Sequence, residues 1–518
     1  MGEISNISSV STLVEIAARK GVRDVVLSPG SRNAPFIISF NGHGAFNCQS
    51  ILDERSAAFV ALGIAQQQKK PVILNCTSGS AVLNYSPALV EAFYQNIPLI
   101  AVTADRPSEW IDQGEGQSMR QVGLMENILI GSFNLVEEHT EDDHWHNNRL
   151  INEAFEMAMS LSRPVQINVP LKEPLYGTVE SNEDSIKTFD VMIPKASLSE
   201  IDLDSLASEF NAAERILVLV AQGNDSLNCL DVLREMNADS KVAILTETHA
   251  NLYHLGFVSS IDRTIESFLK SQLESDYVPD LLITVGGNVI SKKLKALFRR
   301  HKASITNHWH FGDEVMDTYQ SLTRLIKVDP APVLSFLKDL PQNTQYQFGN
   351  KWRAQFFQME QRHLSFLAKC PYSDLKVFEL INDFIPEGAN VQMGNSSVVR
   401  YFQLFNQLRN VSYFGNRGVS GIEGCTSTAV GAAQASDDVT LFVSGDQAFR
   451  YDSNALAVKS GTENLRIIVI NNSGGNIFRI IDGPKDHPVS EGFIEKVDEH
   501  SIRKLVEYHD VGYLEAHD

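Results

Sequence analysis

The sequence repeats one short pattern along its length, a run of apolar residues followed by a polar or glycine-containing turn and often by a helix-like segment. Such runs are DVVL before Ser28, PVILN before Cys76, PLIAVT before Ala104 and PVQINV before Pro170. Their Val, Ile and Leu residues are continuous instead of alternating with polar residues, which is typical of parallel strands covered on both faces. The pattern therefore predicts an α/β fold of doubly wound, mostly parallel sheets whose loops place ligands at one edge.

Length and polar stretches divide the chain further. A chain of 518 residues with 43% hydrophobic residues is long enough for about three domains. The polar stretches 176–200 and 341–350 are typical of linkers, so we expect domains at 1–180, 195–340 and 350–518. The central domain has Rossmann-like runs of apolar residues but no GxGxxG motif, and no nicotinamide site is predicted there.

Charge and cysteine usage exclude several classes of partner. The formal net charge of −20 argues against nucleic acid or an anionic membrane surface as the main partner. No apolar run approaches the roughly 20 residues that span a bilayer, and the N-terminal segment lacks the pattern of a secretory signal. The five cysteines are scattered without CxxC spacing, which indicates reduced thiols and a cytoplasmic protein.

The stretch Leu441–Phe478 is the most informative for chemistry. Two apolar runs in it end in Gly445-Asp446 and in Asn472 followed by Gly474. If a helix joins these strands in a parallel unit, their polar ends meet at the same sheet edge. A carboxylate, an amide oxygen and a backbone carbonyl are suited to Mg²⁺, and helix N-termini there favour phosphate. The alternative is ordinary turn chemistry, since Gly-Asp after a strand and Asn-Asn-Ser-Gly-Gly are common in turns and loops.

Further motifs occur in a characteristic order. They are SPGSR at 28–32, DER at 53–55, TSG at 77–79, TADRP at 103–107, GQSMRQ at 116–121, GNSSVVR at 394–400, NRGVSGIEG at 416–424 and NNSGGNIF at 471–478. Gly445-Asp446 and Asn471-Asn472 resemble the GD…NN signature of thiamine-diphosphate enzymes, although Gln447 stands where many members have a third glycine. The whole set resembles the menaquinone-biosynthetic synthase family that makes 2-succinyl-5-enolpyruvyl-6-hydroxy-3-cyclohexene-1-carboxylate. The match is dense in the first and third domains and thin in the central one.

The resemblance implies a cofactor site for thiamine diphosphate with Mg²⁺ or Mn²⁺. The family places in the DER motif the glutamate that activates the aminopyrimidine, which implies this role for Glu54. On its residues alone, DER is equally an ion-pair cluster at the start of a helix. Ile422 matches the aliphatic residue under the folded cofactor. The cofactor-binding residues implied by the resemblance are Glu54, Gly394, Ile422, Gly445, Asp446, Asn472, Gly474, Ile477 and Phe478, with Asp446, Asn472 and Gly474 at the metal.

The resemblance also implies that the enzyme decarboxylates 2-oxoglutarate and adds the four-carbon unit to isochorismate. Both substrates are dicarboxylic acids, which arginine recognises with paired hydrogen bonds. The implied catalytic and substrate-contacting residues are Glu54, Ser31, Arg32, Arg106, Gln117, Lys292, Ser396, Arg400 and Arg417. Any single arginine is more often a solvent-facing ion pair, but four near strand ends in a chain of charge −20 favour a dianion site.

Other interpretations remain open at this stage. An acetolactate-synthase-like carboligase would use pyruvate and often FAD, and a non-catalytic phosphate-binding protein would keep the sheet edges alone. The acid- and histidine-rich run 137–146 lacks zinc-site spacing, so we expect a solvated segment. The family implies a homodimer or homotetramer with active sites between subunits. Related proteins usually continue past the YLEAHD end through another helix and strand, so the third domain is expected to lack a closing element if the chain is complete.

Overall fold

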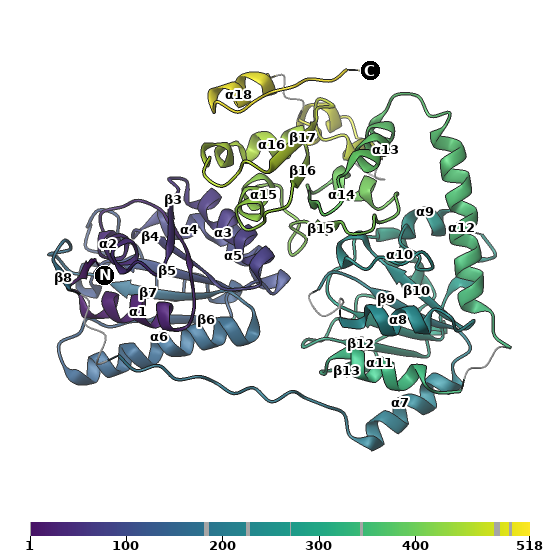
Figure 1. Cartoon of the computed structure of the whole chain (residues 1–518), viewed down its shortest axis with the longest axis horizontal. Helices are drawn as coiled ribbons and strands as arrows, with labels where there is room; N and C mark the ends of the chain where they lie inside the picture. The colour runs from purple at the N-terminus through teal and green to yellow at the C-terminus, as the bar shows by residue number, and fades with distance from the viewer. Residues whose placement is uncertain are drawn as a thin grey trace. The chain divides into compact units, whose positions relative to one another are not determined.

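The computed structural model of the chain describes residues 2–180, 186–223, 228–269, 271–341, 345–480, 487–496 and 500–517 (Figure 1). The chain divides into two compact units. The first contains Met1–Ile193, Gln392–Asn395 and Asn416–Ala516, and the second contains Pro194–Val391, Ser396–Gly415 and His517–Asp518. The candidate residues are therefore described within each unit separately.

The N-terminal part of the first unit contains a six-stranded parallel sheet in the order β3-β2-β4-β5-β7-β6. Its strands are β2 (Asp24–Leu27), β3 (Asn47–Ser50), β4 (Val72–Cys76), β5 (Leu99–Asp105), β6 (Gly131–Asn134) and β7 (Val165–Pro170). The helices are α1 (Ser8–Arg19), α2 (Ala34–His43), α3 (Glu54–Gln68), α4 (Ser80–Asn84), α5 (Ser86–Gln95) and α6 (Glu141–Leu161). Strands β1 (Glu3–Ser5) and β8 (Thr178–Glu180) form a separate antiparallel pair.

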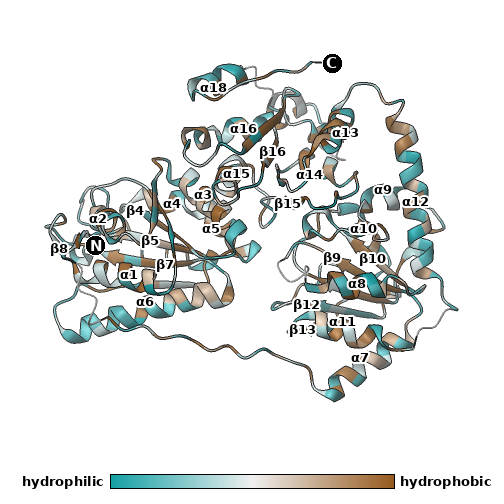
Figure 2. Cartoon of the chain, in the orientation of Figure 1, coloured by the Kyte–Doolittle hydropathy of each residue, from teal (hydrophilic) through white to brown (hydrophobic). Residues whose placement is uncertain are grey.

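Helices cover both faces of this sheet, which explains its continuous apolar runs. Val25 and Val26 are adjacent and fully buried, yet they belong to different cores. Val26 packs in the core that contains α3 and α5, whereas Val25 packs in the core that contains α1, α2 and α6. Figure 2 shows apolar residues along the strands and polar residues on the outer faces of the helices. The predicted α/β fold with parallel sheets is confirmed.

The second unit contains a five-stranded parallel sheet in the order β10-β9-β11-β12-β13. The strands are β9 (Ile216–Val220), β10 (Val242–Thr246), β11 (Leu281–Val285), β12 (Asn307–Phe311) and β13 (Arg324–Ile326). The helices are α7 (Glu200–Ala212), α8 (Leu230–Met236), α9 (Ile261–Glu266), α10 (Lys292–Arg300), α11 (Pro330–Lys338), α12 (Phe348–Leu367) and α13 (Asp374–Phe384). Trp352 and Phe356 of α12 pack in the core of this sheet.

The third sheet has the order β15-β14-β16-β17. Its strands are β14 (Asn390–Met393), β15 (Ser412–Phe414), β16 (Thr440–Gly445) and β17 (Leu465–Ile470). The helices are α14 (Ser397–Phe402), α15 (Cys425–Gln434), α16 (Asp446–Tyr451), α17 (Ile477–Ile480) and α18 (Ile502–Tyr508), with a 3-10 helix at Ser453–Ala457 and a π-helix at Ser490–Ile494. Strands β16 and β17 are parallel, as predicted. The helical connection between β16 and β17 consists of α16, which begins directly at Asp446, and the 3-10 helix at Ser453–Ala457.

The predicted linkers contain little regular structure. Residues 186–199 form neither helix nor strand, while residues 181–185 and 342–344 lie outside the described part of the chain. Helix α12 begins at Phe348, inside the second predicted linker. The division into three domains stays a prediction.

Helices α3 and α15 approach one another so closely that glycine is required on both. A Cβ atom at Gly63 of α3 would lie 2.1 Å from the carbonyl oxygen of Thr428. A Cβ atom at Gly431 of α15 would lie 1.9 Å from the carbonyl oxygen of Val60. Because these obstacles are backbone atoms, neither contact can be relieved by rotating a side chain. The helix pair thus joins the N-terminal and C-terminal segments of the first unit.

This packing predicts an unusual response to a small substitution. Replacing glycine by alanine inside a helix ordinarily stabilises it by roughly 0.5–1 kcal/mol. We expect Gly63→Ala to lower the free energy of unfolding by about 1–3 kcal/mol, because the added methyl group overpacks the contact. Urea denaturation measures the difference. Gly512→Ala is the control, since no atom lies within 4 Å of that Cβ position. A Gly63→Ala protein more stable than the parent contradicts the prediction.

Candidate active site

Two sheets have the topology of a ligand site. In the first sheet, β2 and β4 are neighbours, but the chain continues from them to strands on opposite sides. In the third sheet, β14 and β16 have the same relationship. Ligands of open parallel sheets bind at such switch points, beyond the carboxyl ends of the strands. The four loops that follow these strands contain Ser28–Asn33, Thr77–Gly79, Gly394–Asn395 and Asp446, so the candidates Ser31, Arg32, Gly394 and Asp446 meet this criterion.

Glu54 is the first residue of α3, and its neighbour Asp53 determines where the helix begins. The Asp53 carboxylate accepts a hydrogen bond from the backbone N–H of Ser56 at 3.3 Å, as an N-cap residue does. The Glu54 side chain is half-buried. Burial, with a smaller contribution from the charge of Glu54, raises the pKa values of the Cys76 thiol and the Tyr85 hydroxyl. Glu54 therefore lies near a buried polar interior.

The rest of the DER motif contacts the C-terminal segment of the same unit. The Arg55 guanidinium donates to the carbonyl oxygen of Tyr451 at 3.0 Å and stacks over its ring. Asn454 donates to the Asp53 carboxylate at 2.6 Å. The ion pair between Arg55 and Asp53 is present, but at 3.9 Å it is long. The motif therefore does more than form a surface ion pair, because it joins two distant segments.

The loop after β2 is held tightly, and its two candidates differ in exposure. The Asn33 amide donates to the Ser28 carbonyl oxygen at 2.9 Å, which closes the loop. Ser31 is exposed. Arg32 is buried, and its guanidinium donates to the Leu171 carbonyl oxygen at 2.9 Å and lies 3.3 Å from the Glu173 carboxylate. Arg32 thus contacts the segment after β7, and its role at a substrate stays a prediction.

Arg106 and Gln117 are brought together at the same edge. Arg106 donates to the carbonyl oxygen of Gly116 at 2.9 Å, and the Ser78 hydroxyl donates to the carbonyl oxygen of Gln117 at 2.7 Å. A Cβ atom at Gly79 would lie 3.3 Å from the Gln117 backbone. Gly79 also has φ of +86°, a conformation that favours glycine. The TSG, TADRP and GQSMRQ motifs therefore lie in contact with one another.

A buried polar network below this edge was missed by sequence reasoning. Gln121 accepts from the Gly79 N–H at 2.7 Å and donates to Asn168 at 2.9 Å. Asn168 in turn donates to the Asp105 carboxylate at 2.8 Å. Burial raises the pKa of Asp105, and the Asn168 bond opposes this. The sequence feature that could have revealed this network is Gln121, because it is the last residue of the GQSMRQ motif.

The loop Asn416–Gly424 carries Arg417 and Ile422, and Asn395 holds it from the end of β14. The Asn395 amide donates to the carbonyl oxygens of Asn416 at 2.8 Å and Gly421 at 2.5 Å. Arg417 donates to the Asn395 side-chain oxygen at 2.8 Å. Ile422 is half-buried. Asn395 lies inside the GNSSVVR motif, but sequence reasoning did not identify it as a candidate site residue. Its hydrogen bonds connect this motif to the NRGVSGIEG motif.

Asp446 and Gly474 meet, as the strand order predicts. Asp446 is 1% exposed at the start of α16. Its carboxylate accepts from the backbone N–H groups of Gln447, at 2.8 Å, and Gly474. Arg450 lies 3.4 Å from the carboxylate. Burial is the main cause of its raised pKa. A cation would offset that burial cost.

The surroundings of Asp446 fit a metal-bound diphosphate. A Cβ atom at Gly445 would meet no atom within 4 Å, which shows open space at the end of β16. Asn472 is half-buried, and its carbonyl oxygen accepts from Asn476 at 3.0 Å. Ile477 and Phe478 are half-buried at the start of α17. Among the described residues no group of three or more His, Cys, Asp or Glu side chains is arranged to hold a metal.

The second unit brings the remaining three candidates together. Ser396 has φ of +71° and precedes α14, and Arg400 donates to its carbonyl oxygen at 2.6 Å. The Asp262 carboxylate interacts with the charge of Arg400 and accepts from the Ser291 hydroxyl. Lys292 follows Ser291 as the exposed first residue of α10. Burial lowers the pKa of Arg400, and Asp262 opposes this.

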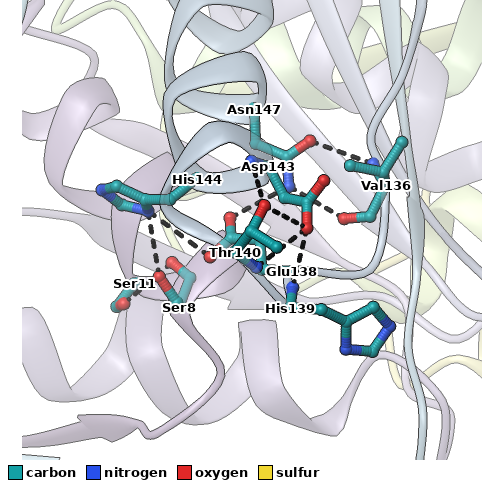
Figure 3. Close-up of polar contacts among 9 residues, drawn as sticks. All are labelled: Ser8, Ser11, Val136, Glu138, His139, Thr140, Asp143, His144 and Asn147. Atoms are coloured by element: carbon teal, nitrogen blue, oxygen red, sulfur yellow. Dashed lines mark hydrogen bonds and ion pairs between the residues drawn. The ribbon is translucent and has the colours of Figure 1, made fainter.

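The acid- and histidine-rich run forms the N-terminus of α6 (Figure 3). The Thr140 hydroxyl accepts from the Asp143 N–H at 3.2 Å, and the Asp143 carboxylate accepts from the N–H of Thr140 at 2.9 Å and of His139 at 3.0 Å. His144 contacts the Ser8 hydroxyl of α1 at 3.2 Å. The ring of His139 points away from these groups in Figure 3. The run therefore contains the capping box of α6, formed by Thr140 and Asp143, and it also contacts α1.

Known proteins similar to this chain identify its family. A family model described as thiamine pyrophosphate enzyme, N-terminal TPP binding domain, matches residues 9–124. A 2-succinyl-5-enolpyruvyl-6-hydroxy-3-cyclohexene-1-carboxylate synthase from Flavobacterium psychrophilum is 39% identical over 98% of this chain and 91% of its own length. The chain belongs to this synthase family. A synthase of the same name from Flavobacterium johnsoniae is 39% identical over 99% of this chain and 92% of its own length. Another, from Porphyromonas gingivalis, is 36% identical over 99% of this chain and 90% of its own length.

Membership of the synthase family confirms the resemblance that the motifs predicted. It also confirms that the chain is a thiamine-diphosphate-dependent enzyme of α/β architecture. The roles of the individual synthase residues stay predictions. No helix within the described residues is both long and apolar enough to cross a membrane.

Asp452 is a buried carboxylate of the synthase that sequence reasoning also missed. It is fully buried and accepts from the Ser427 backbone N–H at 2.6 Å and hydroxyl at 2.8 Å, in the first turn of α15. Burial raises its pKa to about 7 from the ordinary 3.8. Between pH 3.8 and about pH 7, Asp452 therefore keeps its proton in the folded protein but has lost it in the unfolded chain. Protein stability from this group is therefore present below about pH 4 and is lost as the pH rises to about 7.

We expect Asp452→Asn to remove this pH dependence. From pH 5 to pH 8 the free energy of unfolding of the parent should fall by about 3 kcal/mol relative to that of the variant. The reason is that the unfolded parent is already ionised at pH 5, whereas the folded parent loses its buried proton only near pH 7. Urea denaturation at both pH values measures the gap, with the exposed Asp437→Asn as control. An identical gap at pH 5 and pH 8 contradicts the assignment.

Proposed function

We propose that the protein decarboxylates 2-oxoglutarate and adds the remaining four-carbon unit to isochorismate, which gives 2-succinyl-5-enolpyruvyl-6-hydroxy-3-cyclohexene-1-carboxylate and CO₂ in menaquinone biosynthesis. The observation that carries this proposal is identity of 39% across 98% of the chain to a synthase of that name. The geometry supports it, because Ser31, Arg32, Gly394 and Asp446 follow strands at the two switch points, where ligands of parallel sheets bind.

The cofactor of the proposed reaction is thiamine diphosphate with Mg²⁺ or Mn²⁺. When bound, thiamine diphosphate supplies an electron sink for the carbon that loses CO₂. Asp446, Asn472 and Gly474 would hold the metal through oxygen atoms, which hard cations prefer. Asp446 contributes the charge, and its burial in the folded chain favours a cation beside it.

Glu54 would hold and move the proton that activates the cofactor. A carboxyl group does this when it donates a hydrogen bond to the pyrimidine ring. The half-buried position near Cys76 and Tyr85 supports the proposal, since it places the Glu54 carboxyl group beside the protein interior. Ile422, Ile477 and Phe478 would form the apolar wall that excludes water from the reacting carbon.

Charged and polar residues would recognise the carboxylates of the two substrates. Arginine binds a carboxylate through two parallel hydrogen bonds, and the other residues add single donors. The residues in this role are Ser31, Arg32, Arg106, Gln117, Lys292, Ser396, Arg400 and Arg417. The proximity of Arg106 to the Gln117 loop, and of Arg400 to Ser396, supports their action in pairs.

We further propose a homodimer or homotetramer with active sites between subunits. Leu52 is 80% exposed two residues before Glu54, and contact with another subunit there would remove this apolar side chain from water. The domain boundaries 1–180, 195–340 and 350–518 belong to this proposal. So does a cytoplasmic location, which the five free cysteines support.

Turnover of isochorismate tests the proposed function. The protein with thiamine diphosphate, Mg²⁺, 2-oxoglutarate and isochorismate should consume isochorismate, followed by its absorbance, and release CO₂. Replacing 2-oxoglutarate by pyruvate should abolish this, which separates the proposal from an acetolactate-synthase-like reaction. A protein that binds the cofactor but consumes isochorismate with neither acid refutes the proposal.

Glu54→Gln should lower kcat by about 10²–10⁴-fold, because the amide cannot exchange a proton with the cofactor. Affinity for thiamine diphosphate, measured by calorimetry, should change little. Glu141→Gln, an exposed acid of α6, is the matched control. Retention of the parental kcat by Glu54→Gln would remove Glu54 from proton transfer.

Asp446→Asn should weaken the binding of thiamine diphosphate in the presence of Mg²⁺ by at least about tenfold, the lower end of the cost of losing even an outer partner of a metal. The neutral amide no longer offsets the charge of the cation. Calorimetric titration measures this affinity, and Asp437→Asn is the exposed control. Parental affinity in Asp446→Asn would contradict its assignment as a metal ligand.

A further inference from the structure

Glu91 is a buried carboxylate that the proposed chemistry does not use. It lies in α5 and is 1% exposed. Its carboxylate accepts hydrogen bonds from three consecutive backbone N–H groups of the loop Asn416–Gly424, those of Gly418 at 2.5 Å, Val419 at 2.8 Å and Ser420 at 3.3 Å. The Gln95 amide, one turn along the same helix, donates to it at 2.6 Å.

The loop backbone around this carboxylate has the form of an anion-binding concavity. Consecutive N–H groups converge on one anion when the backbone alternates between right- and left-handed conformations, and Ser420 has φ of +67°. A Cβ atom at Gly418 would lie 2.6 Å from the Glu91 carbonyl oxygen, so only glycine permits the approach of loop to helix. The concavity is filled by a side chain of the same chain.

Charge is important for this contact. Burial raises the pKa of Glu91, and the bonds from Val419, Gly418 and the neighbouring donors oppose this rise. A glutamine at this position would turn an N–H₂ group toward backbone N–H groups, and two donors cannot satisfy one another. An anion is therefore better suited to the concavity than a neutral amide.

The two candidate residues of the loop flank the concavity. Arg417 immediately precedes Gly418, and Ile422 lies two residues after Ser420. Asn395 holds the loop from its other side through Asn416, Arg417 and Gly421. The segment between them has its N–H groups bonded to Glu91, so its conformation depends on that carboxylate.

We propose that Glu91 is a positioning residue of the synthase: by binding the N–H groups of residues 418–420 it fixes the loop that directs Arg417 and Ile422 toward substrate and cofactor. This inference rests on the proposed function, which gives Arg417 and Ile422 their roles. Glu91 itself touches neither substrate nor cofactor and acts through the loop.

Amide hydrogen exchange of the cofactor-free protein tests the contact directly. In Glu91→Gln, amides 418–420 should exchange at least about tenfold faster than in the parent, because an N–H₂ donor replaces one of their two acceptor oxygens. Amides of α3 should be unchanged, which shows that the fold is retained. Glu141→Gln is again the matched control. Parental exchange of amides 418–420 in a folded Glu91→Gln protein overturns the inference.

Binding and kinetics test the positioning role. Glu91→Gln should weaken thiamine diphosphate binding and raise the KM for 2-oxoglutarate by about 10- to 100-fold. Glu91→Ala leaves the concavity empty, and added acetate should partly restore both exchange protection and affinity, whereas it should leave the parent unaffected. Parental affinity and KM in Glu91→Gln, or absence of any acetate effect on Glu91→Ala, contradict the inference.

The outcomes for Glu91 and for the proposed function are separable. A parent protein that turns over neither substrate refutes the function, while exchange and acetate rescue still report on the contact. If both Glu91 variants fail to fold, exchange in the parent decides. Slow exchange of amides 418–420, relative to the amides of Gly114–Gly116, supports the contact, and exchange at the rate of an unstructured peptide overturns it.

Discussion

The close packing of α3 against α15 is the constraint on which the candidate site depends. Helix α3 begins at Glu54, and α15 begins at Cys425, directly after the loop with Arg417 and Ile422. Gly63 and Gly431 let the two backbones approach, and a Cβ atom at Gly424 would lie 2.1 Å from the Phe59 ring. Because the two helices cannot slide without backbone clashes, their starting residues are held at a fixed separation within one chain.

Buried carboxylates stabilise the loops around this helix pair. Asp452 accepts from Ser427 at the start of α15, Glu91 accepts from residues 418–420, and Asp105 accepts from Asn168 below the Gln117 loop. In each case N–H or O–H donors of the protein satisfy a buried carboxyl group. Such groups are costly when left unpaired, so each ties its loop to one conformation.

The fold could be predicted from the sequence because its signal is local and repeated. Continuous apolar runs such as Val72–Cys76 indicate a sheet covered on both faces, and the turn after each run marks its carboxyl end. The meeting of Asp446 with Gly474 follows from two parallel strands. The motif set was sufficient to predict the family, since its order along the chain is specific.

The residues that hold the site could not be predicted in this way. Glu91 lies in an ordinary helix, 327 positions before the N–H of Gly418 that it binds, and no local pattern marks that contact. Asp452 follows a helix end where an exposed acid is common. A helix between β16 and β17 could be predicted, but not that α16 begins at Asp446 without a connecting loop. Long-range partners of buried polar groups depend on the packing of elements that are distant in sequence.

A crystal structure of the protein grown with thiamine diphosphate and Mg²⁺ is the most direct measurement of the central claim. The account predicts the metal on the Asp446 carboxylate, with oxygens of Asn472 and Gly474 beside it and the diphosphate in the open space at Gly445. It also predicts a Glu54 carboxyl group from this or a second copy of the chain within hydrogen-bonding distance of the pyrimidine ring. A cofactor bound away from the ends of β14 and β16, or one whose pyrimidine contacts no Glu54, would contradict the account.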